Sequence, residues 1–296
     1  MKQDIYTEVT NRIIDQLEKG VVPWHSPYFS KVGFPKNFAS GKPYHGINVF
    51  LLASLRYTSP WFLTYLQAQE LGGHVRKGEK GSLVIKYGTY KKEEGAANPG
   101  ECEETRRYLK GYTVFHASQI EGVSFPQAEA LPELPAGAAC DRARATVAGM
   151  PKAPAIREGS AIPCYRRNSD SVHMPERRFF TGEEAYYSTL FHELAHSTGH
   201  ESRLARKSLM DNKGIDAEGE ARKVYAEEEL VAEMAASFLC AHAGIIEAEF
   251  SNSAAYLQGW IDSLKSKDAK GWIIRAASQA QKAADFILNI QAEVQP

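Results

Sequence analysis

The sequence predicts an α+β fold, with a mixed N-terminal part that contains a small antiparallel sheet and a mostly helical C-terminal part. Apolar residues alternate along short segments between residues 74 and 116, as they do in half-buried strands. Beyond residue 155 they recur at helical spacing over longer segments. A stretch rich in proline and alanine separates the two patterns. We therefore expect a domain at 1–125, a linker at 126–155 and a second domain at 156–296.

The first domain is expected to begin with an amphipathic helix at residues 4–19. Ile5, Val9, Ile13 and Leu17 recur every fourth residue there, and Gly20 can end the helix. Two shorter helices are expected at about 47–56 and at 61–71. Two strands are expected around the turn at 76–81, and a further strand at 107–116.

The second half reads as a series of helices. A short helix near 138–148 interrupts the expected linker, and longer helices are expected at about 183–198 and 221–243. Two more helices are expected after Ser253.

Composition and charge are ordinary for a globular protein, with 43% hydrophobic residues, 24% charged residues and a formal net charge of −1. Residues 1–90 nevertheless hold 11 Lys or Arg against 6 Asp or Glu, which favours an anionic partner for that part. The four cysteines form no CxxC pair. No apolar stretch approaches membrane-spanning length, so we expect a cytoplasmic protein without a membrane partner.

A metal site is predicted by the sequence His192-Glu193-Leu194-Ala195-His196. On a helix, the four-residue spacing puts both imidazoles on one face, where they can bind one cation. Glu193 would lie beside the metal and act as the catalytic base, taking a proton from water and passing it to a leaving amine.

A third protein ligand is expected, because catalytic zinc sites use three protein ligands and leave one open position. A histidine six residues after His196 would be one solution, but that position is Ser202, and His200 is badly placed just past a glycine. The helix at 221–243 offers Glu229, which we predict as the third ligand, with Glu233 behind it as acceptor for a histidine nitrogen. Glu227 and Glu228 are expected to face solvent, and Glu228 replaces Glu229 if the helical register differs by one residue.

Two imidazoles and one carboxylate favour Zn²⁺, although Mn²⁺ or another first-row divalent ion fits the same donors. A peptidase also needs a group that stabilises the developing oxyanion. Four residues near the predicted site could supply it, and the sequence does not choose among them: Tyr186, Tyr187, Tyr225 and His200.

A nucleic acid is one anionic partner that the first domain would suit. Binding without sequence preference needs aromatic faces for base stacking and cations along the phosphates. Aromatic and basic residues are interleaved there, and we predict DNA contacts from seven of them: Trp24, Lys36, Lys42, Tyr44, Arg76, Lys77 and Lys80. Trp61 and Tyr65, one helical turn apart in the expected helix, are instead predicted to be core residues.

Segments along nearly the whole chain resemble the ArdC-type antirestriction proteins of conjugative plasmids. Similar sequence also forms the N-terminal part of some plasmid primases. In the first domain the resemblance rests on residues 4–7, 23–24, 44–48, 73–81 and 113–115. In the second it rests on 170–175, 187–200, 203–204, 225–226 and 228–233. It implies an N-terminal single-stranded-DNA-binding domain and a C-terminal zincin-like metallopeptidase domain. It also implies a role in protecting incoming plasmid DNA from host restriction.

Three functional hypotheses remain open on the sequence alone. The first is a protein that binds single-stranded DNA and also cleaves a protein substrate at the metal site. The second is a DNA-coating protein whose metal site is structural or vestigial. The third is a metallopeptidase that removes a regulatory protein without contacting DNA.

Overall fold

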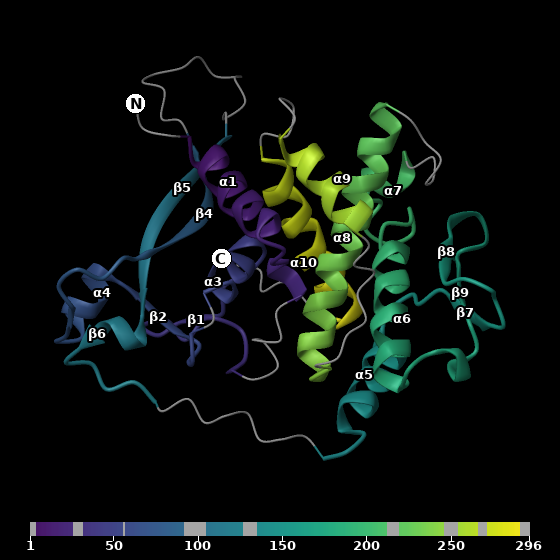
Figure 1. Cartoon of the computed structure of the whole chain (residues 1–296), viewed down its shortest axis with the longest axis horizontal. Helices are drawn as coiled ribbons and strands as arrows, with labels where there is room; N and C mark the ends of the chain where they lie inside the picture. The colour runs from purple at the N-terminus through teal and green to yellow at the C-terminus, as the bar shows by residue number, and fades with distance from the viewer. Residues whose placement is uncertain are drawn as a thin grey trace, which may run out of the picture.

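The computed structural model describes residues 4–25, 32–55, 57–91, 105–126, 135–211, 219–245, 254–265 and 271–290. Figure 1 shows its layers: a sheet at one side, a central group of helices, and a second sheet at the other side. The α+β class expected from the sequence is confirmed, including the mostly helical second half.

The first half contains short helices and two small sheets. Its elements are α1 (Ile5–Glu18), η1 (Pro23–His25), β1 (Lys36–Asn37), α3 (Ile47–Ala53), β2 (Trp61–Thr64), α4 (Tyr65–Glu70), β3 (His74–Val75), β4 (Ser82–Lys91), β5 (Thr105–His116), η2 (Ala117–Gln119) and β6 (Ile120–Glu121). The main sheet has the order β1-β2-β5-β4, and only the β1–β2 pair is parallel. The expected helix at 4–19 and the strand at 107–116 are confirmed within two residues.

The second half contains a three-stranded sheet and the long helices. Its elements are α5 (Ala138–Gly149), β7 (Ala155–Glu158), β8 (Cys164–Arg166), η3 (Arg167–Ser169), β9 (Ser171–Met174), η4 (Arg177–Phe179), α6 (Glu183–Ser197), α7 (Lys207–Met210), α8 (Glu220–Ala243), α9 (Ala254–Lys265) and α10 (Trp272–Ile287). The strands lie in the order β7-β9-β8 beside α6 (Figure 1). The four expected helices at 183–198, 221–243 and after Ser253 are confirmed.

The expected helix at 61–71 is wrong in its first half. Residues 61–64 form β2, where Phe62 pairs with His116 and Leu63 pairs with Phe115. Both Phe62 and Leu63 are fully buried, and a large aromatic side chain suits a half-buried strand. The helix begins only at residue 65, where Thr64 and Gln67 form a capping box. Tyr65 is therefore 49% exposed and not the core residue that was expected.

The two strands expected around the turn at 76–81 exist, but they do not pair with each other. β3 pairs with β6, with His74 opposite Glu121, whereas β4 pairs along its whole length with β5. The turn therefore connects two different sheets.

One hydrophobic core joins the two halves of the chain. Trp24 from η1 packs edge-on against Trp260 of α9, with ring centroids 5.5 Å apart. Phe50 of α3 stacks on Phe238 of α8 at 4.8 Å. The second half begins inside the expected linker. Its first helix, α5, lies within residues 126–155 and buries Cys140 against the same core. Residues 127–134 lie outside the described residues.

Among the described helices, none combines the length and the apolar character that a bilayer crossing requires.

Candidate metal centre and nucleic-acid groove

His192 and His196 lie one turn apart on α6, which is buried along most of its length. The two Nε2 atoms point to the same place and are 3.0 Å apart. Apolar neighbours on the same helix, among them Leu190 and Phe191, pack into the core and fix which face of α6 looks toward α8. Glu193 follows His192 and is also buried.

Glu229 of α8 faces both histidines. Its Oε2 lies 3.5 Å from His192 Nε2, and its Oε1 lies 3.5 Å from His196 Nε2. The structure thus brings together the three residues that the sequence predicts as metal ligands.

The spacing of the two imidazole nitrogens and the Glu229 carboxylate suits one small cation. A tetrahedral ion about 2.0–2.1 Å from each ligand holds its ligand atoms about 3.3–3.4 Å apart. In the structure the two Nε2 atoms are 3.0 Å apart, and each lies 3.5 Å from one of the two carboxylate oxygens of Glu229. Two imidazole nitrogens and one carboxylate are donors that zinc and neighbouring first-row ions prefer.

Glu228 lies inside the protein, so the expectation that it faces solvent is wrong. Its Oε1 lies 3.1 Å from His196 Nδ1. Arg206 donates to both of its oxygens, at 2.5 and 2.8 Å, and Ser208 Oγ donates to Oε2 at 2.6 Å. Successive residues on a helix are about 100° apart, so Glu228 and Glu229 both face α6, one on each side of His196. Glu227 is half-buried.

Glu233 lies behind His192, where the sequence places it. Its Oε1 is 4.0 Å from His192 Nδ1, and its Oε2 is 3.4 Å from His25 Nε2. The Glu233 side chain is 5% exposed and that of His25 is 10% exposed. His25 comes from η1 in the first half of the chain, and no sequence pattern indicates it.

Several carboxylates surround the two histidines. Burial alone disfavours the charged form of His192, but Glu229, Glu233 and Glu193 outweigh that and raise its pKa to about 10. The pKa of His196 is also raised by Glu229 and Glu228, against the effect of its burial. A divalent cation bound to the Nε2 atoms would supply the positive charge that these carboxylates favour.

The four candidate oxyanion groups lie in different surroundings. The Tyr186 hydroxyl donates to Glu158 at 3.0 Å, the buried Tyr187 packs edge-on against Tyr186, and His200 Nδ1 lies 2.8 Å from Ser202 Oγ. Tyr225 precedes Glu229 by one turn of α8 and so lies on the same helix face.

Trp24 is not available to stack on a base. Its side chain is fully buried between Phe50 and Trp260, which corrects its prediction as a DNA contact. Its large apolar ring fills the core between the two halves.

The other predicted DNA contacts divide between two places. Lys42 and Tyr44 line one groove, which is described below. Lys36 lies nearby, with its Nζ over the ring of Trp61. Arg76, Lys77 and Lys80 are exposed in the turn between β3 and β4. Arg76 is bound there to Glu79 at 2.6 Å.

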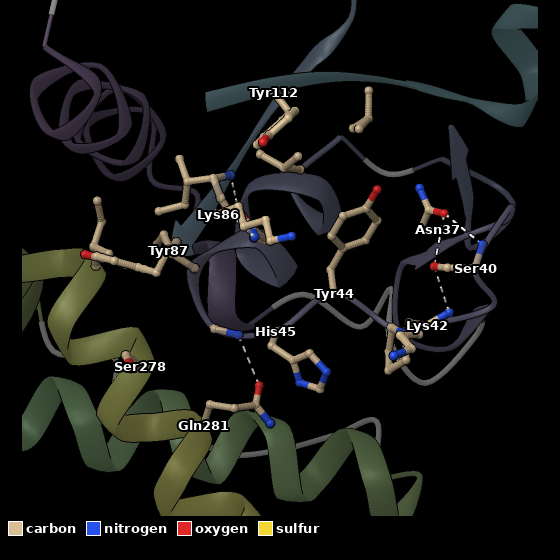
Figure 2. A pocket seen from close by; sticks show the side chains of 18 of the residues that line it. Asn37, Ser40, Lys42, Tyr44, His45, Lys86, Tyr87, Tyr112, Ser278 and Gln281 are labelled. Carbon is tan, nitrogen blue, oxygen red and sulfur yellow. Dashed lines mark hydrogen bonds between the residues drawn. The ribbon is translucent and has the colours of Figure 1, made fainter. Parts of the chain in front are cut away.

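A groove of about 820 Å³ separates the main sheet from α10 (Figure 2). The sheet side contributes polar, aromatic and basic side chains, among them Asn37, Lys42, Tyr44, His45, Lys86 and Tyr87. The α10 side contributes Ser278, Gln281, Lys282 and Asp285. Gln281 accepts a hydrogen bond from the N–H of Gly46 at 3.1 Å, and so ties α10 to the start of α3 (Figure 2).

Comparisons with known proteins match both halves of the chain. Residues 3–115 match the N-terminal domain of the anti-restriction factor ArdC, and residues 145–279 match a zincin-like metallopeptidase family. The crystal structure of the metal-free antirestriction ArdC protein from plasmid R388 is 41% identical, with a TM-score of 0.77. The comparison covers 98% of this chain and all of that one.

The chain belongs to the ArdC antirestriction family. The Mn(II)-bound structure of the R388 ArdC protein is also similar, with 39% identity, a TM-score of 0.74, and coverage of 99% of this chain and 100% of that one. The zincin-like fold of the second half follows from the same matches.

Other relatives include one protein of similar length and one that is much longer. The uncharacterized protein y4eC of Sinorhizobium fredii is 34% identical over 99% of this chain and 94% of its own length. A DNA primase TraC of Escherichia coli is 33% identical over 98% of this chain, which spans only 28% of that primase. The family matches leave residues 116–144 between them, so the boundaries at 125 and 155 remain predictions.

Proposed function

We propose that this protein binds single-stranded DNA and carries a metal-dependent peptidase site, and that it protects incoming plasmid DNA from host restriction in the cytoplasm. The observation that carries the enzymatic half is the convergence of His192, His196 and Glu229 at distances that suit one divalent ion. Zn²⁺ fits these donors best, and Mn²⁺ is the alternative, since the related R388 protein is described with Mn(II) bound.

The roles of the residues follow from their placement. His192 and His196 would bind the ion through Nε2, because each Nδ1 faces a carboxylate of α8. When bound, a divalent ion polarises a substrate carbonyl and lowers the pKa of water. Glu193 lies beside His192 and would accept the proton of the attacking water, then donate it to the leaving amine. Tyr225, one helical turn before Glu229 on α8, is our candidate for stabilising the oxyanion.

Glu193→Gln tests the enzymatic half. The amide keeps the size of the side chain but cannot accept the proton, so hydrolysis of a protein substrate should fall by about 10²–10⁴-fold. Metal affinity should stay within a few fold, because Glu193 is not a ligand in this arrangement. Unchanged hydrolysis would exclude a peptidase of this kind. Full DNA protection by the variant would favour a DNA-coating protein whose metal site is structural.

The groove between the sheet and α10 supports the DNA-binding half. Lys42, Lys86 and Lys282 line it, whereas Asp285 is the only acidic residue among the described lining residues. Tyr44 and Tyr87 line it as well, and Tyr87 is half-exposed. Cations for phosphates beside aromatic faces for bases are what single-strand binding without sequence preference requires.

Lysine substitutions can locate the DNA. Lys42→Glu and Lys282→Glu should each weaken binding of a labelled oligonucleotide and flatten the dependence of log K on log salt by about 0.7 per lost phosphate contact. Lys207→Glu, an exposed lysine on α7, is the control and should change neither. If Lys77→Glu weakens binding and Lys42→Glu does not, the DNA lies at the β3–β4 turn and not in the groove. If the wild-type protein binds no oligonucleotide, the remaining hypothesis is a peptidase that does not contact DNA.

A further inference from the structure

Each candidate metal-binding histidine has its own supporting carboxylate on α8. Glu228 Oε1 lies 3.1 Å from Nδ1 of His196, within hydrogen-bond distance, and Glu233 Oε1 lies 4.0 Å from Nδ1 of His192. Such carboxylates fix the tautomer and the ring orientation of a metal-binding histidine. A buried carboxylate must itself be held in place by donors.

The two carboxylates are held from different parts of the chain. Glu228 is held by Arg206 and Ser208, which belong to the same half as the metal centre. Glu233 receives its corresponding contact from His25, at 3.4 Å, and His25 lies 208 residues away in the sequence. Both side chains of this pair are almost completely buried.

The segment that carries His25 is anchored along the same face of α8. Ser237 follows Glu233 by one helical turn, and its hydroxyl donates to the carbonyl of Trp24. The Trp24 ring is fully enclosed, in edge-on contact with Phe50 and Trp260. The neighbouring residue is thus fixed in the core, which places the His25 imidazole at Glu233.

We propose that His25 is a positioning residue of the metal centre, holding Glu233 so that Glu233 orients His192 toward the ion. His25 does for His192 what Arg206 does for His196. This inference rests on the proposed metal site. It also means that the metal centre is completed by a residue from the half of the chain that matches the ArdC N-terminal domain.

Metal affinity of the full chain tests this role directly. Dissociation constants for Zn²⁺ and Mn²⁺ are measured by competition with a chelator for wild type, His25→Ala and His25→Gln. His25→Ala should bind about 10–100-fold more weakly, the usual loss for a residue behind a metal ligand. His25→Gln should recover most of the affinity, because its amide N–H can replace the Nε2–H donor.

Two controls separate positioning from a general structural effect. His74 also lies 3.4 Å from a carboxylate, that of Glu121, but this pair is exposed on β3 and β6. His74→Ala should therefore leave the metal affinity unchanged. Glu233→Ala should weaken binding, and adding His25→Ala to it should weaken binding no further. If His25→Ala impairs folding, the same comparison is made with His25→Gln and His25→Asn, of which only Gln should retain affinity.

The outcomes are distinct. Wild-type affinity in His25→Ala, or additive losses in the double variant, would overturn the positioning role while leaving the metal site intact. Absence of metal binding in wild type would refute the proposed function and, with it, the role of His25.

Discussion

Glu228→Ala is expected to destabilise the protein strongly, because it leaves a buried positive charge without a partner. The Arg206 side chain is 2% exposed, and Glu228 accepts hydrogen bonds from its Nε and Nη2. Breaking a buried ion pair by removing one partner costs about 3–5 kcal/mol. Glu228→Gln keeps one acceptor oxygen and should cost less, about 1.5–3 kcal/mol, the range for hydrogen bonds to a charged group.

Equilibrium unfolding in urea without added metal measures this cost, provided that the slope m stays unchanged. Glu176→Ala is the matched control, since it removes the carboxylate of an exposed ion pair, 3.0 Å from Arg178, and should cost no more than about 1 kcal/mol. Adding Arg206→Met to Glu228→Ala should restore part of the lost stability. A cost below about 1 kcal/mol for Glu228→Ala, or no recovery in the double variant, would refute this reasoning.

Three further predictions concern other parts of the molecule. Trp24→Ala should lower the free energy of unfolding by about 3–5 kcal/mol in thermal or urea denaturation, with oligonucleotide affinity of the folded fraction unchanged. Burial lowers the pKa of His116 to about 4, so the folded state favours its neutral form. The free energy of unfolding should therefore decline by up to about 3 kcal/mol as the pH falls from about 6.5 to about 4. His116→Gln should remove that part of the pH dependence in urea titrations at several pH values. Tyr225→Phe should reduce the rate of hydrolysis more than substrate affinity, whereas Tyr186→Phe should change neither in the same steady-state assay.

Much of the fold was predictable because it depends on local periodicity. The long helices α6 and α8 carry apolar residues at helical spacing, and their ends are found within one or two residues of the expected positions. The short strands of the second half, β7, β8 and β9, were not expected. Each has only three or four residues, too few to show a clear alternation.

The same contrast holds for the candidate site, where residues on one helix could be predicted and contacts between distant segments could not. The two histidines and Glu193 follow from spacing on one helix, and Glu229 follows from a second helix with a glutamate-rich face. The role of Glu228 was missed because helical register alone does not say how α8 packs on α6. His25 and Lys282 could not be found from sequence, since each reaches its site through contacts between segments more than 200 residues apart.

Trp24 shows the limit of reading aromatic residues in loops. The same ring can stack on a base or fill a core, and the sequence around Pro23 does not distinguish the two. The decision depends on Trp260 and Phe50, which the fold brings to the ring.

Metal binding by the purified full chain is the most direct test of the central claim. Isothermal titration of the metal-free protein with Zn²⁺, and separately with Mn²⁺, should show one ion per chain. Glu229→Ala and His196→Ala should each abolish binding or weaken it by several orders of magnitude, because they remove a ligand atom from the three that converge. No binding by wild type, or equal binding by wild type and Glu229→Ala, would contradict the assignment of this site.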